Sequence, residues 1–87
     1  MIRELKFTPQ GARDFEKLPF EIRKRIREKL TLYLDSGSPM SFTKPLVNLP
    51  PATHRFRVGK YRILVYLDGS NIVIDGVDTR SEAYRRR

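Results

Sequence analysis

The segment 54–67, HRFRVGKYRILVYL, decides the fold, because apolar residues recur at every second position on either side of a short interruption. This spacing is typical of β-strands with one buried face. Gly59-Lys60 interrupts the pattern, and a glycine at the first position of a two-residue loop favours a type II′ turn. The segment therefore predicts two antiparallel strands joined as a hairpin.

The loop also fixes which residues face each other across the hairpin. It pairs Val58 with Tyr61, Arg57 with Arg62, Phe56 with Ile63 and Arg55 with Leu64. One face is then apolar and is expected to pack on helices; it carries Phe56, Val58, Tyr61, Ile63, Val65 and Leu67. The other face carries Arg55, Arg57 and Arg62, together with Leu64 and Tyr66.

Three arginines on one sheet face indicate a binding site for an anion. Like charges directly opposite each other on a sheet are unfavourable by a few tenths of a kcal/mol to about 1 kcal/mol per pair. No acidic residue adjoins Arg55, Arg57 or Arg62 in the sequence. Converging guanidinium groups bind an oxyanion well, most naturally a phosphate. The alternative is that these arginines are outer-face side chains that contact only water.

The flanking segments predict the remaining elements. Residues 72–77 follow a turn and predict the last strand, and residues 2–7 predict a short edge strand. Thr8-Pro9 is typical of a helix start. A second helix, ending near Gly37, is predicted from apolar residues at helical spacing: Ile22, Ile26, Leu30, Tyr33 and Leu34. The proline-rich stretch 38–53 is expected to be loop, with one short extended piece from Leu46, Val47 and Leu49.

This order of elements predicts one α+β domain that spans residues 1–87. Its expected topology is β-α-α-β-β-β, with an antiparallel sheet and an αα-hairpin packed on one face.

The composition favours a polyanionic partner. The chain carries 18 Lys and Arg against 10 Asp and Glu, a net charge of +8, which favours nucleic acid, an anionic membrane or an acidic protein. Without cysteine, and with His54 as its one histidine, the sequence excludes disulfides and argues against a zinc site or a catalytic triad. Because no signal peptide or membrane span is recognisable, we expect a cytoplasmic protein. The acidic residues form no evident cluster in the sequence, and arginines can neutralise a phosphate, so we expect no metal or cofactor.

Two stretches resemble the RelE/ParE toxin superfamily: RFRVGKYRILVY at 55–66 and the closing RSEAY at 80–84. The order of predicted elements agrees with that family as well. For RelE-type members, the resemblance implies a toxin of a type II toxin–antitoxin system, a ribosome-dependent endoribonuclease (mRNA interferase) that inhibits translation. The RNA 2′-OH attacks the adjacent phosphate, which gives a cyclic phosphate and a free 5′-OH.

The resemblance also assigns catalytic positions. Arg62 matches the family's phosphate-holding arginine. Tyr84 matches its C-terminal tyrosine, a candidate for the base or for stacking on a nucleobase near the cut. Arg80 matches the arginine four residues earlier and is a candidate for the acid that protonates the leaving oxygen.

The sequence departs from the family at other positions of the site. Arg55 and Arg57 match positions that are often lysine, and arginine gives up a proton very poorly. Asp78 and Thr79 stand where members often carry a further basic residue or a histidine. The general base therefore stays open, and an inactive member remains one alternative.

Further basic residues are candidates for contacts with RNA and the ribosome: Arg23, Lys24, Arg27, Lys44 and Lys60. The first three belong to the second predicted helix, where a charged face that only contacts water is the alternative. His54 alternates with Phe56 and is expected to be a packed or edge histidine. Tyr33 and Tyr61 are expected in the core, whereas Tyr66 shares the arginine face.

A toxin implies protein partners. The resemblance implies a cognate antitoxin in a heteromeric complex that binds operator DNA. Two other functions stay open: a ParE-like toxin that blocks DNA gyrase without nuclease activity, and a non-catalytic nucleic-acid-binding module. Arg62, Arg80 and Tyr84 belong to the nuclease pattern, and a binding module would keep its function after substitution of Tyr84.

Overall fold

The hairpin predicted at 54–67 lies at the centre of the computed structural model, which describes residues 4–79 of the chain. Its strands are β3 (His54–Val58) and β4 (Tyr61–Asp68). The observed pairs are the predicted ones: Val58–Tyr61, Arg57–Arg62, Phe56–Ile63 and Arg55–Leu64. Gly59 in the turn has a positive φ of 60°, which glycine adopts readily.

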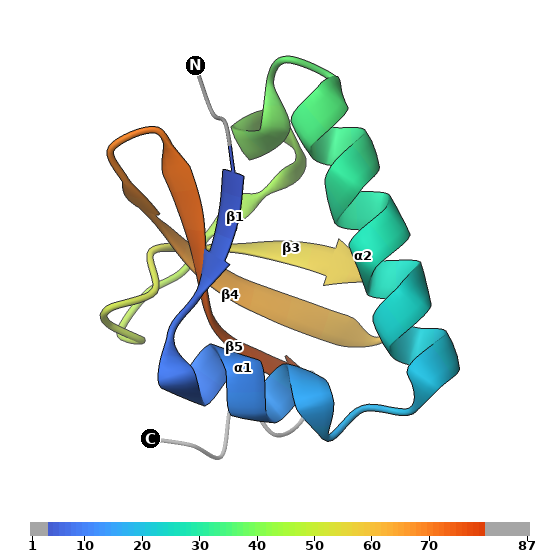
Figure 1. The fold of residues 1–87 in the computed structure, drawn as a ribbon. Coiled ribbons are helices and arrows are strands. Elements are labelled where there is room, and N and C mark those ends of the chain that lie inside the picture. Colours follow the sequence, from blue (N-terminus) through green and yellow to red (C-terminus); the bar gives the residue numbers. More distant parts are fainter. Residues whose placement is uncertain (1–3, 80–87) are drawn as a thin grey trace.

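Five strands form one mixed sheet in the order β1-β5-β4-β3-β2 (Figure 1). Strands β5 (Asn71–Thr79) and β2 (Lys44–Pro45) lie antiparallel beside β4 and β3, whereas β1 (Glu4–Phe7) runs parallel to β5. The predicted α+β class is confirmed, but the sheet is not wholly antiparallel. Alternation of apolar and polar residues shows which face of a strand is buried, but it does not show whether the strand runs parallel or antiparallel to its neighbour. The extended piece expected around Leu46, Val47 and Leu49 lies earlier, at β2.

Helix α1 (Pro9–Glu16) begins where the sequence predicts, because Thr8 caps it. The Thr8 hydroxyl accepts a hydrogen bond from the backbone N–H of Gly11 at 3.0 Å. The helix packs against β5, and Gly11 is buried in that contact.

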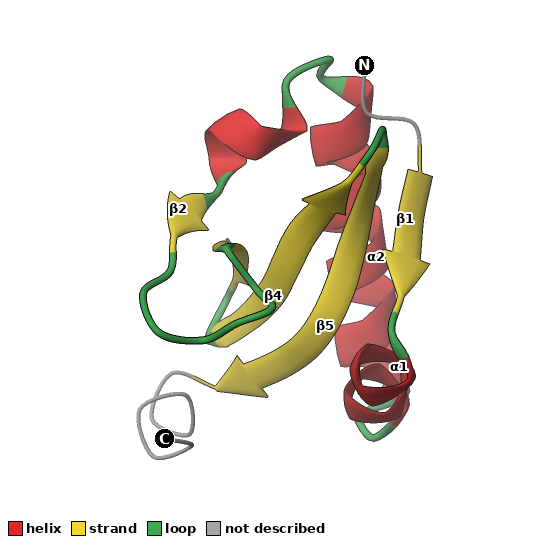
Figure 2. Ribbon diagram, turned by 90° about the vertical axis from the view of Figure 1, so that its left-hand side faces the viewer, coloured by secondary structure: helices red, strands yellow, loops and turns green. Residues whose placement is uncertain are grey.

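Helix α2 (Phe20–Asp35) follows Pro19 and ends before Gly37, which has a positive φ of 84°. A short 3-10 helix, η1 (Pro39–Phe42), comes next. Figure 2 shows both α-helices on one side of the sheet, as the predicted αα-hairpin requires. Within the part of the chain that the structure describes, neither helix has the length and apolar character needed to cross a membrane.

The core lies between the helices and the apolar face of the hairpin. Its buried members are Ile26, Leu30, Phe56, Val58, Ile63, Val65, Ile72, Ile74 and Val77. Tyr33 stacks on Phe42 and on Phe56, with ring centroids 4.4 Å and 5.4 Å apart. The expected core positions of Tyr33 and Tyr61 are confirmed, because both pack against this cluster.

A β-bulge interrupts β5 in its middle. Val65 pairs with Ile74 and Leu64 pairs with Gly76, so Asp75 is an extra residue in β5. Residues before the bulge face the helices at even positions (Ile72, Ile74), whereas after it the odd position Val77 does so. The bulge therefore reverses which side chains of β5 reach each face of the sheet.

Helix α1 and its cap hold this bulge. Ile74 O accepts a hydrogen bond from Thr8 N at 3.0 Å, and the Thr8 hydroxyl lies 3.2 Å from a carboxylate oxygen of Asp75. Just beyond the bulge, Val77 N donates to the carboxylate of Asp14 at 3.1 Å. Thr8 at the N-cap of α1 and Asp14 within α1 thus hold the bulge and the residues just after it in place.

Candidate active site

The arginines predicted to share a face do so. In the observed register, Arg57 lies opposite Arg62, and Arg62 lies opposite Asp78 of β5. These three residues form one row across three neighbouring strands, on the face turned away from the helices. This row, Arg57–Arg62–Asp78, is called the charged row below.

A second row on the same face adds another cation. Lys44 of β2 lies opposite Arg55, and Arg55 lies opposite Leu64. Lys44, expected from the sequence to contact RNA, therefore joins the sheet site through a strand that the sequence did not predict. Cross-strand neighbours on one face have Cβ atoms about 5 Å apart, so the cations of both rows can contact one polyanion.

The four cations of the two rows differ in solvent exposure. Arg57 and Lys44 are exposed, whereas Arg55 and Arg62 are half-buried. The Nε atom of Arg62 is shielded from solvent. A guanidinium held partly out of water interacts more strongly with a bound anion than an exposed one does, since the local dielectric constant is lower. Arg62 is thus the most enclosed cation of the charged row.

Asp78 is the functional candidate that sequence reasoning missed. Asp78 is only 5% exposed, and it is the one charged residue that is buried within residues 4–79. The sequence shows no acid next to the arginines, but the fold brings this carboxylate opposite Arg62. The Asp75-Gly76 pair inside a strand pattern was the available signal, because glycine within a strand suggests a bulge.

Two other residues considered from the sequence, Tyr66 and His54, lie on opposite faces of the sheet. Tyr66 is half-buried on β4, two residues beyond Leu64, and lies on the arginine face as predicted. Its ring is suited to stack on a nucleobase. His54 pairs with Val65, so it lies on the core side of β3, and its Nδ1 is 2.9 Å from the Thr53 hydroxyl. His54 is therefore a half-buried edge residue outside the charged row.

The basic residues of α2 lie on the opposite layer from the charged row. The Arg23 guanidinium carbon lies 5.9 Å from the ring centroid of Phe20, and that of Arg27 lies 5.6 Å from the ring of Phe15. Arg27 also lines an apolar pocket of about 110 Å³ between β1 and the two helices. The structure thus does not bring Arg23 and Arg27 together with the sheet arginines.

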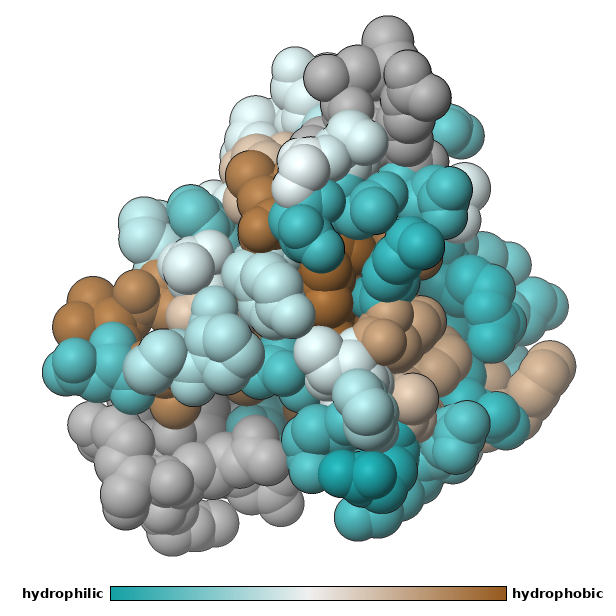
Figure 3. Space-filling model, turned by 60° about the vertical axis from the view of Figure 1, so that its left-hand side comes forward, coloured by the Kyte–Doolittle hydropathy of each residue, from teal (hydrophilic) through white to brown (hydrophobic). Residues whose placement is uncertain are grey.

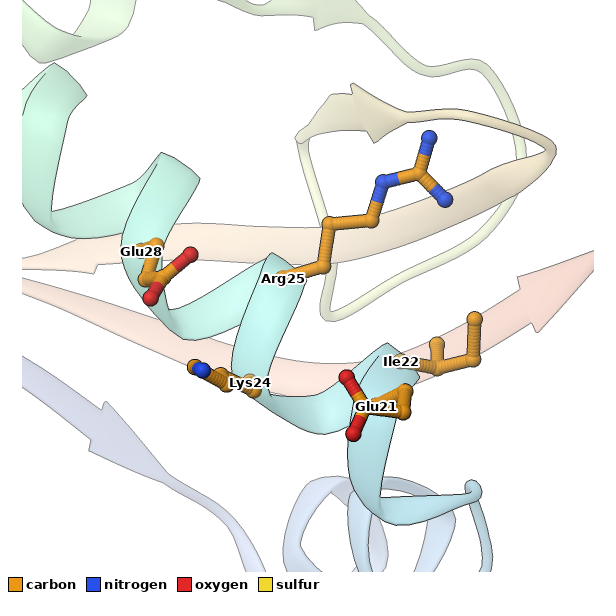
Figure 4. A pocket seen from close by; sticks show the side chains of 5 residues that line it. All are labelled: Glu21, Ile22, Lys24, Arg25 and Glu28. Carbon is orange, nitrogen blue, oxygen red and sulfur yellow. The ribbon is translucent and has the colours of Figure 1, made fainter.

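A second pocket, of about 350 Å³, lies beside the first half of α2 (Figure 4). It is lined by Glu21, Ile22, Lys24, Arg25 and Glu28, a mixture of both charges that favours neither anions nor cations. Figure 4 shows Arg25 reaching from α2 toward the strands. Its guanidinium lies 3.9 Å from the position that a Cβ on Gly59 would take. Arg25, which the sequence did not single out, therefore brings the charge of α2 next to exposed Lys60.

Apolar side chains are also exposed. The large ones are Phe7, Phe20, Leu32, Phe42, Val47 and Leu67. They come from different elements, and Figure 3 shows apolar areas separated by hydrophilic ones on one side of the molecule. The surface thus offers cationic and apolar contacts together.

Two catalytic candidates, Arg80 and Tyr84, lie outside the described residues. Between residues 4 and 79, no three or more His, Cys, Asp or Glu side chains gather in a way that could hold a metal ion. The cations that could neutralise a phosphate at the described site are those of the two rows.

Solved structures resemble this fold over nearly its whole length. A chain of the toxin–antitoxin complex RelBE2 from Mycobacterium tuberculosis shares 32% identity, with a TM-score of 0.73, over 92% of this chain and 100% of that one. The RelB–RelE antitoxin–toxin complex from Methanococcus jannaschii matches at 27% identity and a TM-score of 0.68, over 92% and 95%. The Escherichia coli RelBE complex matches at 18% identity and a TM-score of 0.65, over 86% and 93%, and supports the fold alone.

No protein-family model and no curated protein sequence matches the chain. The match at 32% identity covers 92% of this chain and the whole of the relative's chain. The protein therefore belongs to the RelE family of toxins.

Proposed function

We propose that this RelE-family toxin is an endoribonuclease that cleaves mRNA on the ribosome. The observation that carries the proposal is the cationic face of the sheet, on which Arg57 and Arg62 lie opposite each other beside Arg55 and Lys44. The net charge of +8 adds attraction for RNA over the whole molecule. The carboxylate of Asp78 opposite Arg62 offsets part of the repulsion between these cations, and a bound phosphate would offset the rest.

The proposed reaction needs strong stabilisation of negative charge. When the 2′-OH attacks the adjacent phosphate, charge builds up on the non-bridging oxygens, and preorganised donors lower that barrier. Half-buried Arg62 is the donor we assign to those oxygens, with Arg57 beside it. Arg55 and Lys44 are assigned to neighbouring phosphates. Because guanidinium groups neutralise the phosphate, the proposed mechanism needs no metal ion.

The candidates near the C-terminus complete the proposal. By the match of RSEAY to the family pattern, Arg80 is assigned to a phosphate contact or to protonation of the leaving oxygen. Tyr84 is assigned to proton transfer or to stacking on a nucleobase at the cut.

A second cationic surface would serve the ribosome. Lys24 and Arg25 are exposed on α2, and Lys60 is exposed at the hairpin turn that Arg25 approaches. Two cationic surfaces on opposite layers allow the mRNA to lie on one and ribosomal RNA on the other. Arg23 and Arg27 extend this second surface along α2.

An antitoxin is the proposed protein partner. The similar structures from Mycobacterium tuberculosis and Methanococcus jannaschii are toxin–antitoxin complexes. The exposed apolar residues and the positive charge suit an acidic, partly apolar polypeptide. We propose that this complex forms in the cytoplasm and binds operator DNA through the antitoxin.

The test is cleavage of a defined mRNA on purified ribosomes, mapped by primer extension, with the same RNA free in solution as the control. We expect cuts only on ribosomes. A protein that arrests growth and cuts no RNA in either condition would contradict the proposal and would favour the gyrase-blocking alternative. Unchanged gyrase supercoiling activity in the presence of the toxin would exclude that alternative.

A further inference from the structure

The bulge in β5 determines where Asp78 points. Strict alternation from Ile72 and Ile74 would turn Asp78 toward the helices and would leave a carboxylate in the apolar core. The extra residue Asp75 reverses the alternation, so that Val77 packs in the core and Asp78 lies opposite Arg62. Bulges occur often beside active sites, where they redirect one side chain.

The proposed reaction needs a proton acceptor that the described arginines cannot supply. A guanidinium stays protonated at any physiological pH and cannot remove a proton from a 2′-OH. His54 lies on the other face of β3, opposite Val65. The charged row holds a carboxylate, Asp78, and a carboxylate is a common general base.

We propose that Asp78 is the general base of the cleavage reaction, an inference that rests on the endoribonuclease function proposed above. Its carboxylate takes the proton of the 2′-OH as the bond between the 2′ oxygen and phosphorus forms. The bond between phosphorus and the 5′ oxygen then breaks, and the 5′ oxygen takes a proton from a water molecule. The hydroxide that remains takes the proton from Asp78, which restores the carboxylate and the water. The products are a 2′,3′-cyclic phosphate and a free 5′-OH. Arg62 holds the non-bridging oxygens during both steps.

The position of Asp78 suits this role. It lies directly across the ladder from Arg62, so the base and the phosphate donor are neighbours on one surface. Its low exposure limits competition from bulk water, and charges act more strongly in such a site. The bulge that aims it is held by Thr8, Asp14 and Gly11, which lie outside the charged row.

The experiment is single-turnover cleavage of mRNA on programmed ribosomes across a pH series. It compares wild type with Asp78→Asn, Asp78→Glu and the control Asp68→Asn, an exposed carboxylate at the far end of β4. We expect the wild-type rate to fall at acidic pH as Asp78 becomes protonated. Asp78→Asn should be about 100- to 10,000-fold slower and should lose this acid limb while binding ribosomes normally. Asp78→Glu should cleave more slowly than wild type, but its rate should still fall at acidic pH. Asp68→Asn should match wild type in both rate and pH dependence.

Several results would overturn the inference. Asp78→Asn could cleave at the wild-type rate, or it could be slow yet keep the wild-type pH dependence, as a residue that only positions Arg62 would. A wild-type profile without an acid limb would overturn it even if Asp78→Asn failed to fold. Each result requires that wild type cleaves mRNA, whereas loss of the proposed function itself would appear as no cleavage by wild type.

Discussion

Gly11 of α1 lies against the carbonyl oxygen of Ile74 in β5, so closely that a Cβ on Gly11 would overlap that oxygen. Ile74 is the last residue before the bulge, and the same oxygen accepts a hydrogen bond from Thr8 N. The helix can approach the strand this closely only because glycine has no side chain. The start of the chain thus supports the strand that carries Asp78.

Replacement of Gly11 by alanine should therefore destabilise the protein. Alanine is favoured over glycine in a helix by about 1 kcal/mol, but the overlap with Ile74 O should outweigh this gain. We expect Gly11→Ala to lower the free energy of unfolding by roughly 1–3 kcal/mol, measured by urea denaturation. Glu16→Ala, an exposed change in the same helix, should stay within about 0.5 kcal/mol of wild type. A Gly11→Ala variant more stable than wild type would show that α1 does not make this contact.

Tyr33 should matter through its ring and not through its hydroxyl. The ring stacks between Phe42 and Phe56, so Tyr33→Ala should cost about 3 kcal/mol of unfolding free energy. Tyr33→Phe keeps both stacks and should retain wild-type stability and mRNA cleavage. Thermal unfolding and a cleavage assay on both variants check this. Loss of cleavage by a stable Tyr33→Phe protein would contradict the expectation and would indicate that the Tyr33 hydroxyl takes part in cleavage.

The salt dependence of the affinity for ribosomes should show whether the cations on the sheet face contact phosphates. With an mRNA that carries a 2′-deoxynucleotide at the cut site, binding can be measured without cleavage. Arg57→Ala and Lys44→Ala should each reduce the slope of log affinity against log salt by up to about one, because each removes one phosphate contact. Arg13→Ala removes an equal charge from α1, where Arg13 binds Gln10, and should leave the slope unchanged. Equal effects of all three variants would indicate general attraction without a defined site.

The hairpin and the arginine face were predictable because they depend on local rules. Gly59-Lys60 allows a two-residue turn, and period-two alternation then assigns every side chain of β3 and β4 to a face. The start of α1 at Thr8-Pro9 and the apolar stripe of α2 follow from equally local signals.

Contacts between distant segments could not be read in this way. The parallel pairing of β1 with β5 joins the two ends of the described chain. The approach of Arg25 to Gly59 depends on how α2 crosses the sheet. Asp78 was assigned only as a departure from the family pattern, because one bulge residue, Asp75, decides the face on which it lies.

The role of Arg62 is tested most directly by comparing mRNA cleavage on programmed ribosomes by wild type, Arg62→Ala and the charge-matched control Arg13→Ala. We expect ribosome-dependent cuts by wild type and Arg13→Ala. We expect a rate about 100- to 1,000-fold lower for Arg62→Ala, because a donor to the developing charge is lost. Folding of each variant is checked by its thermal unfolding. Cleavage by a folded Arg62→Ala protein at the wild-type rate would contradict the assignment of the charged row as the active site.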